Sequence, residues 1–378
     1  MAHAVFRQGR GRAQVNAVRA DMAGFQRALR AWFRAGKRDL PWRRTRDPYR
    51  IWISEIMLQQ TRVAAAVPYY ERFLKRFPTV RALSQARSEQ VLRYWAGLGY
   101  YSRARNLHRA AREIVARRSG RFPRAYDAAL RLPGVGRYTA AAVLSIAYDA
   151  PHAVLDGNVA RVLARIEARR GDLRAPQPWS ELQKSAQELL APNKPGEWNQ
   201  ALMELGATVC TPRAPRCGSC PVSRWCAAYR LGIAESLPAV RRKRAPVKLR
   251  IAAAVLLDPR GRTLVVKSGA GKPAGADALF SRMWQFPAVE VGRNARAELA
   301  RHLRSRFRVQ AASLLPLAQA RHTVTFREIT LAPFLIPVER FPEIECARTP
   351  LLSRLANLAV SSATRKIAST ALACTRSA

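Results

Sequence analysis

The chain has 378 residues, of which 48% are hydrophobic, so it is long enough for two or three packed domains and too apolar for a disordered chain. It contains no apolar run of about 18 residues, and the stretch from Met1 to Arg19 lacks the apolar core of a secretion signal, so we expect a cytoplasmic protein. Lys and Arg total 66 against 25 Asp and Glu, a formal net charge of +41, which indicates a polyanionic partner, most simply nucleic acid.

The first half of the chain is predicted to be helical. Val91–Trp95, Arg103–Arg117 and Thr139–Ala147 place apolar residues at helical spacing, and Gly or Pro residues separate such segments. We therefore expect a basic extension over 1–21, followed by a helical domain over 22–230.

The segment Asp47–Thr61 (DPYRIWISEIMLQQT) predicts a helix that begins at an N-cap aspartate followed by proline. Glu55 and Gln59 share one face of this helix. A single carboxyl group among so many apolar neighbours is a candidate for a raised pKa, provided that it is buried. In isolation, a surface glutamate on an amphipathic helix is the more common arrangement.

The segment Leu132–Ala140 (LPGVGRYTA) predicts a turn between two helices over about 125–145. Gly134 and Gly136 flank Val135 and allow a tight turn with positive φ. Amide groups at the start of the next helix then favour an anion, as in a phosphate-binding helix-hairpin-helix turn. An ordinary helix–helix turn has similar punctuation.

In Ala153–Arg161 (AVLDGNVAR), Asp156 stands at the start of a helix predicted to continue to Ile166. An aspartate there is commonly only an N-cap. That interpretation predicts a loss of stability on substitution, without a specific loss of chemistry. Capping and catalysis do not exclude each other.

Four of the six cysteines lie in one short loop: Cys210, Cys217, Cys220 and Cys226, with 6, 2 and 5 residues between them. In a cytosolic chain such clustering indicates a metal centre. Four thiolates suit zinc as well as a cubane iron–sulfur cluster, and the spacing alone leaves both open. Cys346 and Cys374 have no assignable role.

The second half changes character after a basic, proline-bearing stretch, Arg241–Pro246, which predicts a linker over 231–250. An α+β domain is expected over 251–352, followed by a tail, 353–378, without a recognisable pattern. The expected strands are Ile251–Leu257, Thr263–Lys267, His322–Thr325 and Ile329–Ile336, and the expected helix is Ala295–Phe307.

Together these features resemble the helix-hairpin-helix DNA glycosylases that carry an iron–sulfur cluster, and specifically the MutY type. The first half carries this resemblance through LPW at 40–42, SEIMLQQT at 54–61, GLGYY at 97–101 and LDGNV at 155–159. WQFP at 284–287 and RHT at 321–323 look like the C-terminal, Nudix-related domain of that family. The implied fold is a mainly α-helical N-terminal half, with two helical subdomains and a cluster loop over 210–226, followed by an α+β Nudix-like domain.

The resemblance implies base excision repair by a monofunctional glycosylase, which flips out adenine mispaired with 8-oxoguanine or guanine and hydrolyses its N-glycosidic bond. Glu55 matches the general acid and Asp156 the carboxylate that stabilises the oxocarbenium-like sugar. Asn158 and Tyr138 match residues that support these two groups. The implied DNA- and base-binding residues are Trp42, Arg43, Gln60, Thr61, Tyr100, Gly134, Val135 and Gly136. The four clustered cysteines would hold a [4Fe–4S] cluster, and the protein would act as a monomer on double-stranded DNA, associated with the bacterial nucleoid.

Two positions refine this expectation. Endonuclease III-like enzymes have a lysine where this chain has Tyr138, and tyrosine cannot form the Schiff base that leads to strand cleavage.

The Phe-Ser-His that follows Arg-His-Thr in the family is replaced by Val324-Thr325-Phe326, so we expect altered recognition of 8-oxoguanine that centres on the Thr325 hydroxyl. Alternatively, these three are only sheet residues. Arg296–Arg306 has Glu298 as its one acidic residue, so nucleotide hydrolysis is not expected.

Three other functions are compatible with parts of the sequence. One is a related glycosylase that acts on thymine glycol or mismatched thymine, and the Glu55 motif and the C-terminal domain argue against it. Another is a non-enzymatic DNA-binding sensor with a redox-active cluster, which leaves the two carboxylates unexplained. The last is a zinc-stabilised RNA-binding protein, for which the sequence lacks the usual RNA modules.

Overall fold

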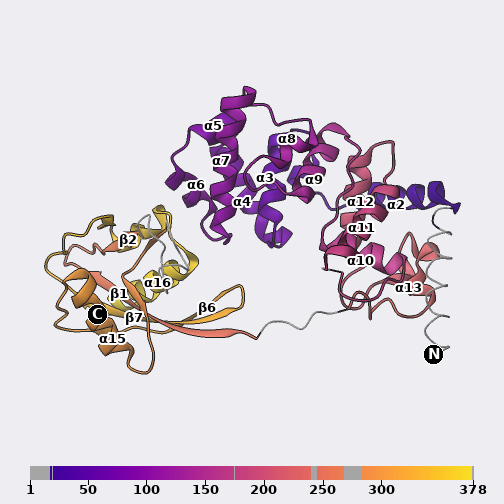
Figure 1. Ribbon diagram of the computed structural model, residues 1–378. Helices are drawn as coiled ribbons and strands as arrows, with labels where there is room; N and C mark the ends of the chain where they lie inside the picture. The colour runs from indigo at the N-terminus through magenta and orange to yellow at the C-terminus, as the bar shows by residue number, and fades with distance from the viewer. Residues whose placement is uncertain (1–17, 19, 174, 240–244, 268–282, 377–378) are drawn as a thin grey trace. The chain divides into compact units, whose positions relative to one another are not determined.

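The computed structural model describes residues 18, 20–173, 175–239, 245–267 and 283–376 (Figure 1). The chain forms two compact units. We call Met1–Gln85 with Asn106–Arg242 the helical unit, and Ala86–Arg105 with Lys243–Ala378 the sheet unit. The border at Arg242 falls within the predicted linker, but the grouping of Ala86–Arg105 with the C-terminal half was not predicted. Most of the basic extension and the basic run of the linker lie outside the described residues.

The described part of the helical unit consists of helices and connecting turns. The three predicted helical segments are confirmed, since they fall in α6, α7 and α9. The helices are α2 (Met22–Gly36), α3 (Pro48–Leu58), α4 (Val63–Arg76), α5 (Val80–Gln85), α8 (Tyr126–Leu130), α9 (Arg137–Tyr148), α10 (Gly157–Ile166), α11 (Pro176–Glu188), α12 (Pro195–Thr208) and α13 (Ala227–Arg230), with 3-10 turns η1 (Pro41–Arg43), η2 (Cys217–Ser219) and η3 (Ser223–Trp225). Helix α6 (Ser88–Trp95) belongs to the sheet unit, and α7 (Tyr101–Arg118) runs from the sheet unit into the helical unit.

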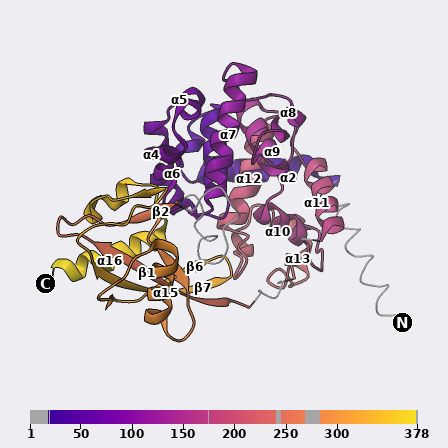
Figure 2. The same ribbon diagram turned by 60° about the vertical axis from the view of Figure 1, so that its left-hand side comes forward.

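Two helices of this unit are largely interior. In α3 every residue from Ile51 to Met57 is buried, as expected of a helix that is apolar all round. It packs against α4 and α9. Helix α12 packs against α2, α9 and α10, which surround it in both views (Figure 1, Figure 2). Ser54 and Glu55 on α3 and Glu204 on α12 are therefore placed inside the unit.

The sheet unit is built on two long parallel strands, β1 (Val247–Leu257) and β7 (Arg327–Pro337). β4 (Ala288–Glu290) pairs antiparallel with β1, while β5 (Leu315–Pro316) and β6 (Ala320–Val324) pair antiparallel with β7. A second sheet has the order β3 (Trp284–Gln285), β2 (Val265–Lys267), β8 (Ala347–Arg348). The four predicted strands are confirmed with small shifts of their ends.

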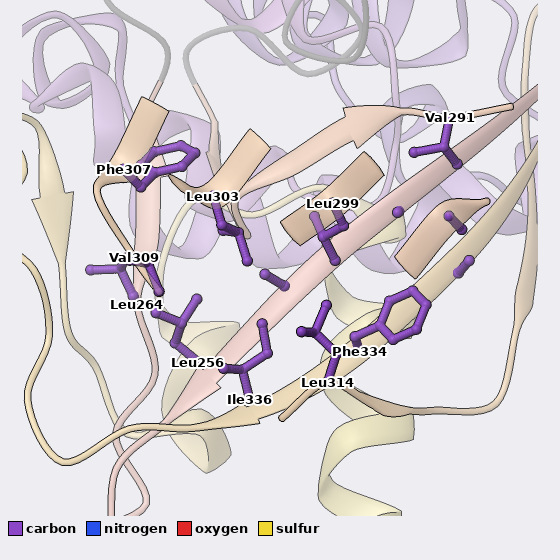
Figure 3. Close-up of a cluster of buried hydrophobic side chains, with 14 residues drawn as sticks. Leu256, Leu264, Val291, Leu299, Leu303, Phe307, Val309, Leu314, Phe334 and Ile336 are labelled. Carbon is purple, nitrogen blue, oxygen red and sulfur yellow. The ribbon is translucent and has the colours of Figure 1, made fainter. Parts of the chain in front are cut away.

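One helix covers each face of the larger sheet. The predicted helix Ala295–Phe307 is confirmed as α15, and its Leu299, Leu303 and Phe307 pack against alternate residues of β1 and β7 (Figure 3). Helix α16 (Ser362–Arg376) contacts β1 and β7, and Figure 3 shows the C-terminal helix behind the sheet. The tail for which no pattern was recognised is therefore structured, since η4 (Leu352–Asn357) precedes α16.

No helix in the described ranges is both long and apolar enough to cross a membrane.

Candidate active site

A cavity of about 520 Å³ in the helical unit brings together most of the predicted site residues of that unit. Its lining comes from η1, α3, the turn after α3, α9, the start of α10 and α12. The predicted site residues that line it are Trp42, Arg43, Glu55, Gln60, Thr61, Tyr138, Asp156 and Asn158. Its volume falls in the range of small-molecule sites, so the cavity is large enough for a purine.

Glu55 lies on α3 at the base of this cavity and is only 4% exposed. The Tyr138 hydroxyl donates a hydrogen bond of 2.7 Å to Glu55 Oε2. Burial raises the pKa of Glu55 to about 7, and the charge of Asp156 adds to this, while the Tyr138 hydrogen bond and Arg43 act in the opposite direction. The predicted raised pKa is confirmed, and the alternative of a surface glutamate is wrong.

Tyr138 lies in the first turn of α9, immediately after the hairpin turn, which explains how it reaches α3. Its hydroxyl also contacts Met203 Sδ at 3.2 Å. Burial and the nearby Glu55 carboxyl raise the pKa of Tyr138 well above its ordinary value, so the hydroxyl keeps its proton. It is therefore a fixed hydrogen-bond donor to Glu55.

Asp156 is the N-cap of α10, as predicted. Its Oδ1 accepts from the Val159 amide at 2.7 Å, and its Oδ2 accepts from Asn158 Nδ2 at 3.3 Å. Burial raises the pKa of Asp156, and the hydrogen bonds from the Val159 and Asn158 amides partly offset this effect. The same carboxyl group thus caps a helix and faces the cavity.

Asn158 is in turn held by Arg161, one turn further along α10. Arg161 Nη2 donates to Asn158 Oδ1 at 2.8 Å, and Arg161 Nε donates to the Cys210 carbonyl at 2.9 Å. The loop of clustered cysteines therefore contacts the helix that presents Asp156.

Arg165, which is 1% exposed, continues this contact. It donates to the Thr211 carbonyl at 2.7 Å and to Cys210 Sγ at 3.3 Å. Its own carbonyl accepts from Cys226 Sγ at 3.4 Å. The cysteine loop is thus anchored on α10 from both of its ends.

The four clustered cysteines are half-buried free thiols. Burial raises the pKa of Cys220 to about 12, and the neighbouring thiols Cys210, Cys226 and Cys217 raise it further. A metal centre on these side chains would have to bind them as thiolates, because the thiolate is the form of cysteine that ligates a metal. Among the described residues, no group of three or more ligating side chains is gathered closely enough to hold a single metal ion.

Two residues of the cavity were missed by sequence reasoning, namely Glu204 on α12 and Arg38. Glu204 is 2% exposed and accepts from Arg38 Nη2 at 2.6 Å and from Arg43 Nη2 at 2.7 Å. These hydrogen bonds outweigh the effect of burial and lower the pKa of Glu204 to about 2. A lone carboxylate within the apolar stretch ALMELGA was the one available signal, the same signal that marked Glu55.

The hairpin turn agrees with the prediction in part. Gly134 has φ +78°, and a Cβ added there would lie 2.7 Å from Asn106 Cβ, so glycine is required. Gly136 has φ −92° and is the N-cap of α9, so the expected positive φ is wrong there. Val135, a predicted DNA-binding residue, is buried, and its amide donates to the Leu132 carbonyl at 3.1 Å. Its side chain and its amide therefore stabilise the turn itself.

Three of the predicted site residues are exposed and adopt the left-handed backbone conformation: Gln60 (φ 57°), Tyr100 (φ 48°) and Thr325 (φ 55°). This conformation is strained for a residue with a side chain and most of all for a β-branched one. Tyr100 and Thr325 belong to the sheet unit, the latter at the tip of the β6–β7 hairpin, so neither lines the cavity of the helical unit.

The helical unit thus holds a buried, protonatable glutamate and a second carboxyl group in the lining of one cavity. Residues 53–192 match the family model "HhH-GPD superfamily base excision DNA repair protein". The chain is also similar to a solved thermostable thymine-DNA glycosylase, with 30% identity and a TM-score of 0.52 over 57% of this chain and 99% of the other. The chain belongs to the HhH-GPD superfamily of base excision DNA repair proteins.

Curated relatives within this superfamily are adenine DNA glycosylases. The rat protein is 47% identical over 219 residues, covering 56% of this chain and 42% of the relative. The Arabidopsis thaliana protein is 42% identical over 226 residues, covering 53% of this chain and 36% of the relative. The protein of Buchnera aphidicola subsp. Schizaphis graminum is 37% identical over 207 residues, covering 54% of this chain and 60% of the relative. The chain thus spans between about a third and 60% of the length of these relatives.

Proposed function

We propose that the chain is a monofunctional adenine DNA glycosylase of the MutY type, which excises adenine opposite 8-oxoguanine or guanine. The observation that carries the proposal is the pairing in one cavity of Glu55, whose pKa is about 7, with a second carboxylate, Asp156. An N-glycosylase needs an acid that is still protonated near neutral pH and a negative charge beside the sugar. The curated relatives named above support adenine as the base.

The reaction follows from the positions of these groups. The target nucleotide leaves the base stack and enters the cavity, because its glycosidic bond is inaccessible within a duplex. Glu55 donates its proton to the purine and makes it a better leaving group, while Tyr138 keeps the carboxyl group oriented. The Asp156 carboxylate then stabilises the positive charge that develops on the sugar until water completes the hydrolysis.

Trp42 and Arg43 supply the walls for the base. The Trp42 ring packs edge-on against Tyr70 with centroids 5.3 Å apart, so its orientation is fixed. Arg43 is held by Glu204 and by the Arg38 carbonyl at 3.0 Å. A guanidinium fixed in this way presents its remaining donors to the acceptor nitrogens of a flipped adenine.

Cys210, Cys217, Cys220 and Cys226 are proposed to hold a [4Fe–4S] cluster. When bound, this cluster would cross-link the loop that Arg161 and Arg165 attach to α10. A broad visible absorbance band in the purified protein would support it, and a colourless protein with stoichiometric zinc would overturn it.

The opposite strand is proposed to be read by three exposed residues. Gln60 and Tyr100 act as wedges that offset the cost of unstacking. Thr325 offers a hydroxyl to 8-oxoguanine from the tip of the β6–β7 hairpin, where its strained backbone is compatible with a binding role. Tyr138 in place of a lysine leaves no amine for a Schiff base with the sugar, so strand cleavage requires alkali.

A second candidate activity is the excision of mismatched thymine, which the similarity to the thymine-DNA glycosylase favours. A single-turnover assay decides between the two on duplexes that hold adenine opposite 8-oxoguanine or guanine, or thymine opposite guanine. We expect nicks after alkali with the adenine duplexes only. Thymine release without adenine release would replace the proposal, and tight binding without release of either base would favour a sensor.

A further inference from the structure

The exposed Tyr100 is part of the sheet unit rather than of the helices that flank it in the sequence. Ala86–Arg105, which contains α6 and the loop Gly97–Tyr101, groups with Lys243–Ala378. The Thr325–Phe326 tip of the β6–β7 hairpin lies in the same unit. Two of the three residues proposed to read the opposite strand, Tyr100 and Thr325, therefore belong to one compact body.

Glu89, in the first turn of α6, attaches this segment to the smaller sheet. Its Oε1 accepts from Trp284 Nε1 on β3 at 2.6 Å. Arg348 on β8 donates to Oε1 at 2.9 Å and to Oε2 at 3.1 Å, a two-pronged ion pair. The Arg348 guanidinium also lies 4.6 Å from the centroid of the Trp284 ring. Such a charge-assisted and doubly bonded contact fixes orientation as well as distance.

The surroundings of Glu89 are otherwise cationic. Arg87, Arg93 and Arg348 line a cavity of about 200 Å³ together with Glu89. Glu89 is the acidic residue among these guanidinium groups, and its carboxylate bonds α6 to both β3 and β8. Its loss should therefore matter more than the loss of an ordinary surface ion pair.

The loop that bears Tyr100 is tied to the helices on either side of it. Trp95 Nε1 at the end of α6 donates to the Gly99 carbonyl at 3.1 Å. Arg103 Nη2 on α7 donates to the carbonyls of Leu98 and Gly99, each at 3.3 Å. The Arg103 guanidinium lies 5.4 Å from the ring centroids of both Trp95 and Tyr100. A movement of α6 would therefore carry Tyr100 with it.

We propose that Glu89 is a positioning residue for recognition of the base opposite adenine. It locks α6 and the Tyr100 loop to the smaller sheet, so that the wedge and the hairpin tip engage the oxidised base as one body. This inference rests on the function proposed above and assigns Glu89 no contact with DNA.

The test compares Glu89→Gln with Glu290→Gln, which removes the same charge from an exposed position on β4. Two readouts are measured on each full-length variant: the ratio of single-turnover rates with adenine opposite 8-oxoguanine and opposite guanine, and the fluorescence of 2-aminopurine placed beside the lesion, which reports unstacking by the wedge. We expect Glu89→Gln to lower the rate ratio about fivefold and to reduce the fluorescence increase. Glu290→Gln should resemble the wild type in both.

The pathway through Tyr100 is tested in a Tyr100→Ala background. If Glu89 acts by holding this wedge, Glu89→Gln should have no further effect on the rate ratio once the ring is absent. An equal effect in both backgrounds, or equal ratios for Glu89→Gln and Glu290→Gln, would overturn the inference. If Glu89→Gln lowered the rates opposite 8-oxoguanine and opposite guanine by the same factor and also lowered thermal stability, Glu89 would have a merely structural role. That result would also overturn the inference. Absence of adenine release from the wild type would instead refute the proposed function itself.

Discussion

At the scale of single residues, the proposed reaction depends on a protonated Glu55. Its pKa of about 7 comes mainly from burial in α3, which the Tyr138 hydrogen bond partly offsets. Burial also raises the pKa of Asp156, but hydrogen bonds from the Val159 and Asn158 amides partly offset that effect, so the two carboxyl groups have different environments.

This difference predicts the pH dependence of excision. The single-turnover rate should be constant below the pKa of Glu55 and fall about tenfold per pH unit above about 7, because only the protonated acid can transfer a proton. The measurement is adenine release between pH 5.5 and 9 under saturating protein. A rate that stays constant through pH 8.5 would contradict the assignment of Glu55 as the acid.

The same shift predicts a pH-dependent stability. Because the pKa of Glu55 is raised from 4.5 when unfolded to about 7 when folded, the folded wild type loses stability as pH rises through that window. Glu55→Gln has no such titration. Between pH 4.5 and 7.5 its free energy of unfolding should therefore rise by about 3 kcal/mol relative to that of the wild type. Thermal unfolding of both proteins at pH 5 and pH 8 checks this. A Tm difference that does not change with pH would show that Glu55 is not buried as described.

Local patterns singled out Glu55 in an apolar helix and Asp156 at a helix start, but only the resemblance to the MutY type implied a chemical role for either. Sequence reasoning missed Glu204 and Arg38 because their pairing joins positions 166 residues apart, which no local pattern records. The buried environment of Glu55 could be stated only as a condition, since burial depends on α9 and α4 packing around α3.

At the scale of elements, α10 connects the site to the cysteine loop. Its N-cap is Asp156, and its Arg161 and Arg165 hold the loop through Cys210. The helix therefore fixes both the carboxylate proposed to stabilise the sugar and the loop proposed to carry the cluster.

The two roles of Asp156 can be separated by substitution. Asp156→Ser keeps an N-cap oxygen but removes the charge, so it should retain stability within about 0.5 kcal/mol and lose adenine excision by at least about 100-fold. Asp156→Ala should lose excision and about 1 kcal/mol of stability as well. Chemical denaturation and single-turnover rates on the three proteins provide the comparison. Substantial excision by Asp156→Ser would show that Asp156 serves only as a helix cap.

The elements themselves were predictable to different degrees. α15 was predicted with its observed ends because its apolar residues recur at helical spacing. α16 was missed because its buried residues are mostly alanines, Ala363, Ala368 and Ala371 with Ile367, which differ little in hydrophobicity from the serines and threonines beside them. Gly136 was assigned a positive φ because two nearby glycines suggested one turn, whereas it begins α9 in an extended conformation.

At the scale of the whole molecule, a net charge of +41 predicts strong and salt-sensitive DNA binding. If the protein neutralises about six phosphates, its affinity for a duplex should fall about 10³-fold between 50 and 200 mM salt through counterion release. Fluorescence anisotropy with a duplex of ordinary sequence measures this dependence. An affinity that hardly changes with salt would show that the charge does not serve DNA binding.

The composition of the two units was the least predictable feature. The change of character near Arg241 located one border, but Ala86–Arg105 joins the sheet unit through contacts such as Glu89 with Arg348, which are 259 residues apart. The Nudix likeness of the sheet unit and the roles of its Thr325 and Tyr100 stay predictions.

The most direct test is the release of free adenine from a duplex with adenine opposite 8-oxoguanine, measured under single-turnover conditions for the wild type and Glu55→Gln. We expect stoichiometric adenine release by the wild type, an intact strand until alkali is added, and no release by Glu55→Gln despite unchanged binding. Equal adenine release by both proteins would remove Glu55 from the mechanism, and no release by the wild type would contradict the proposed function.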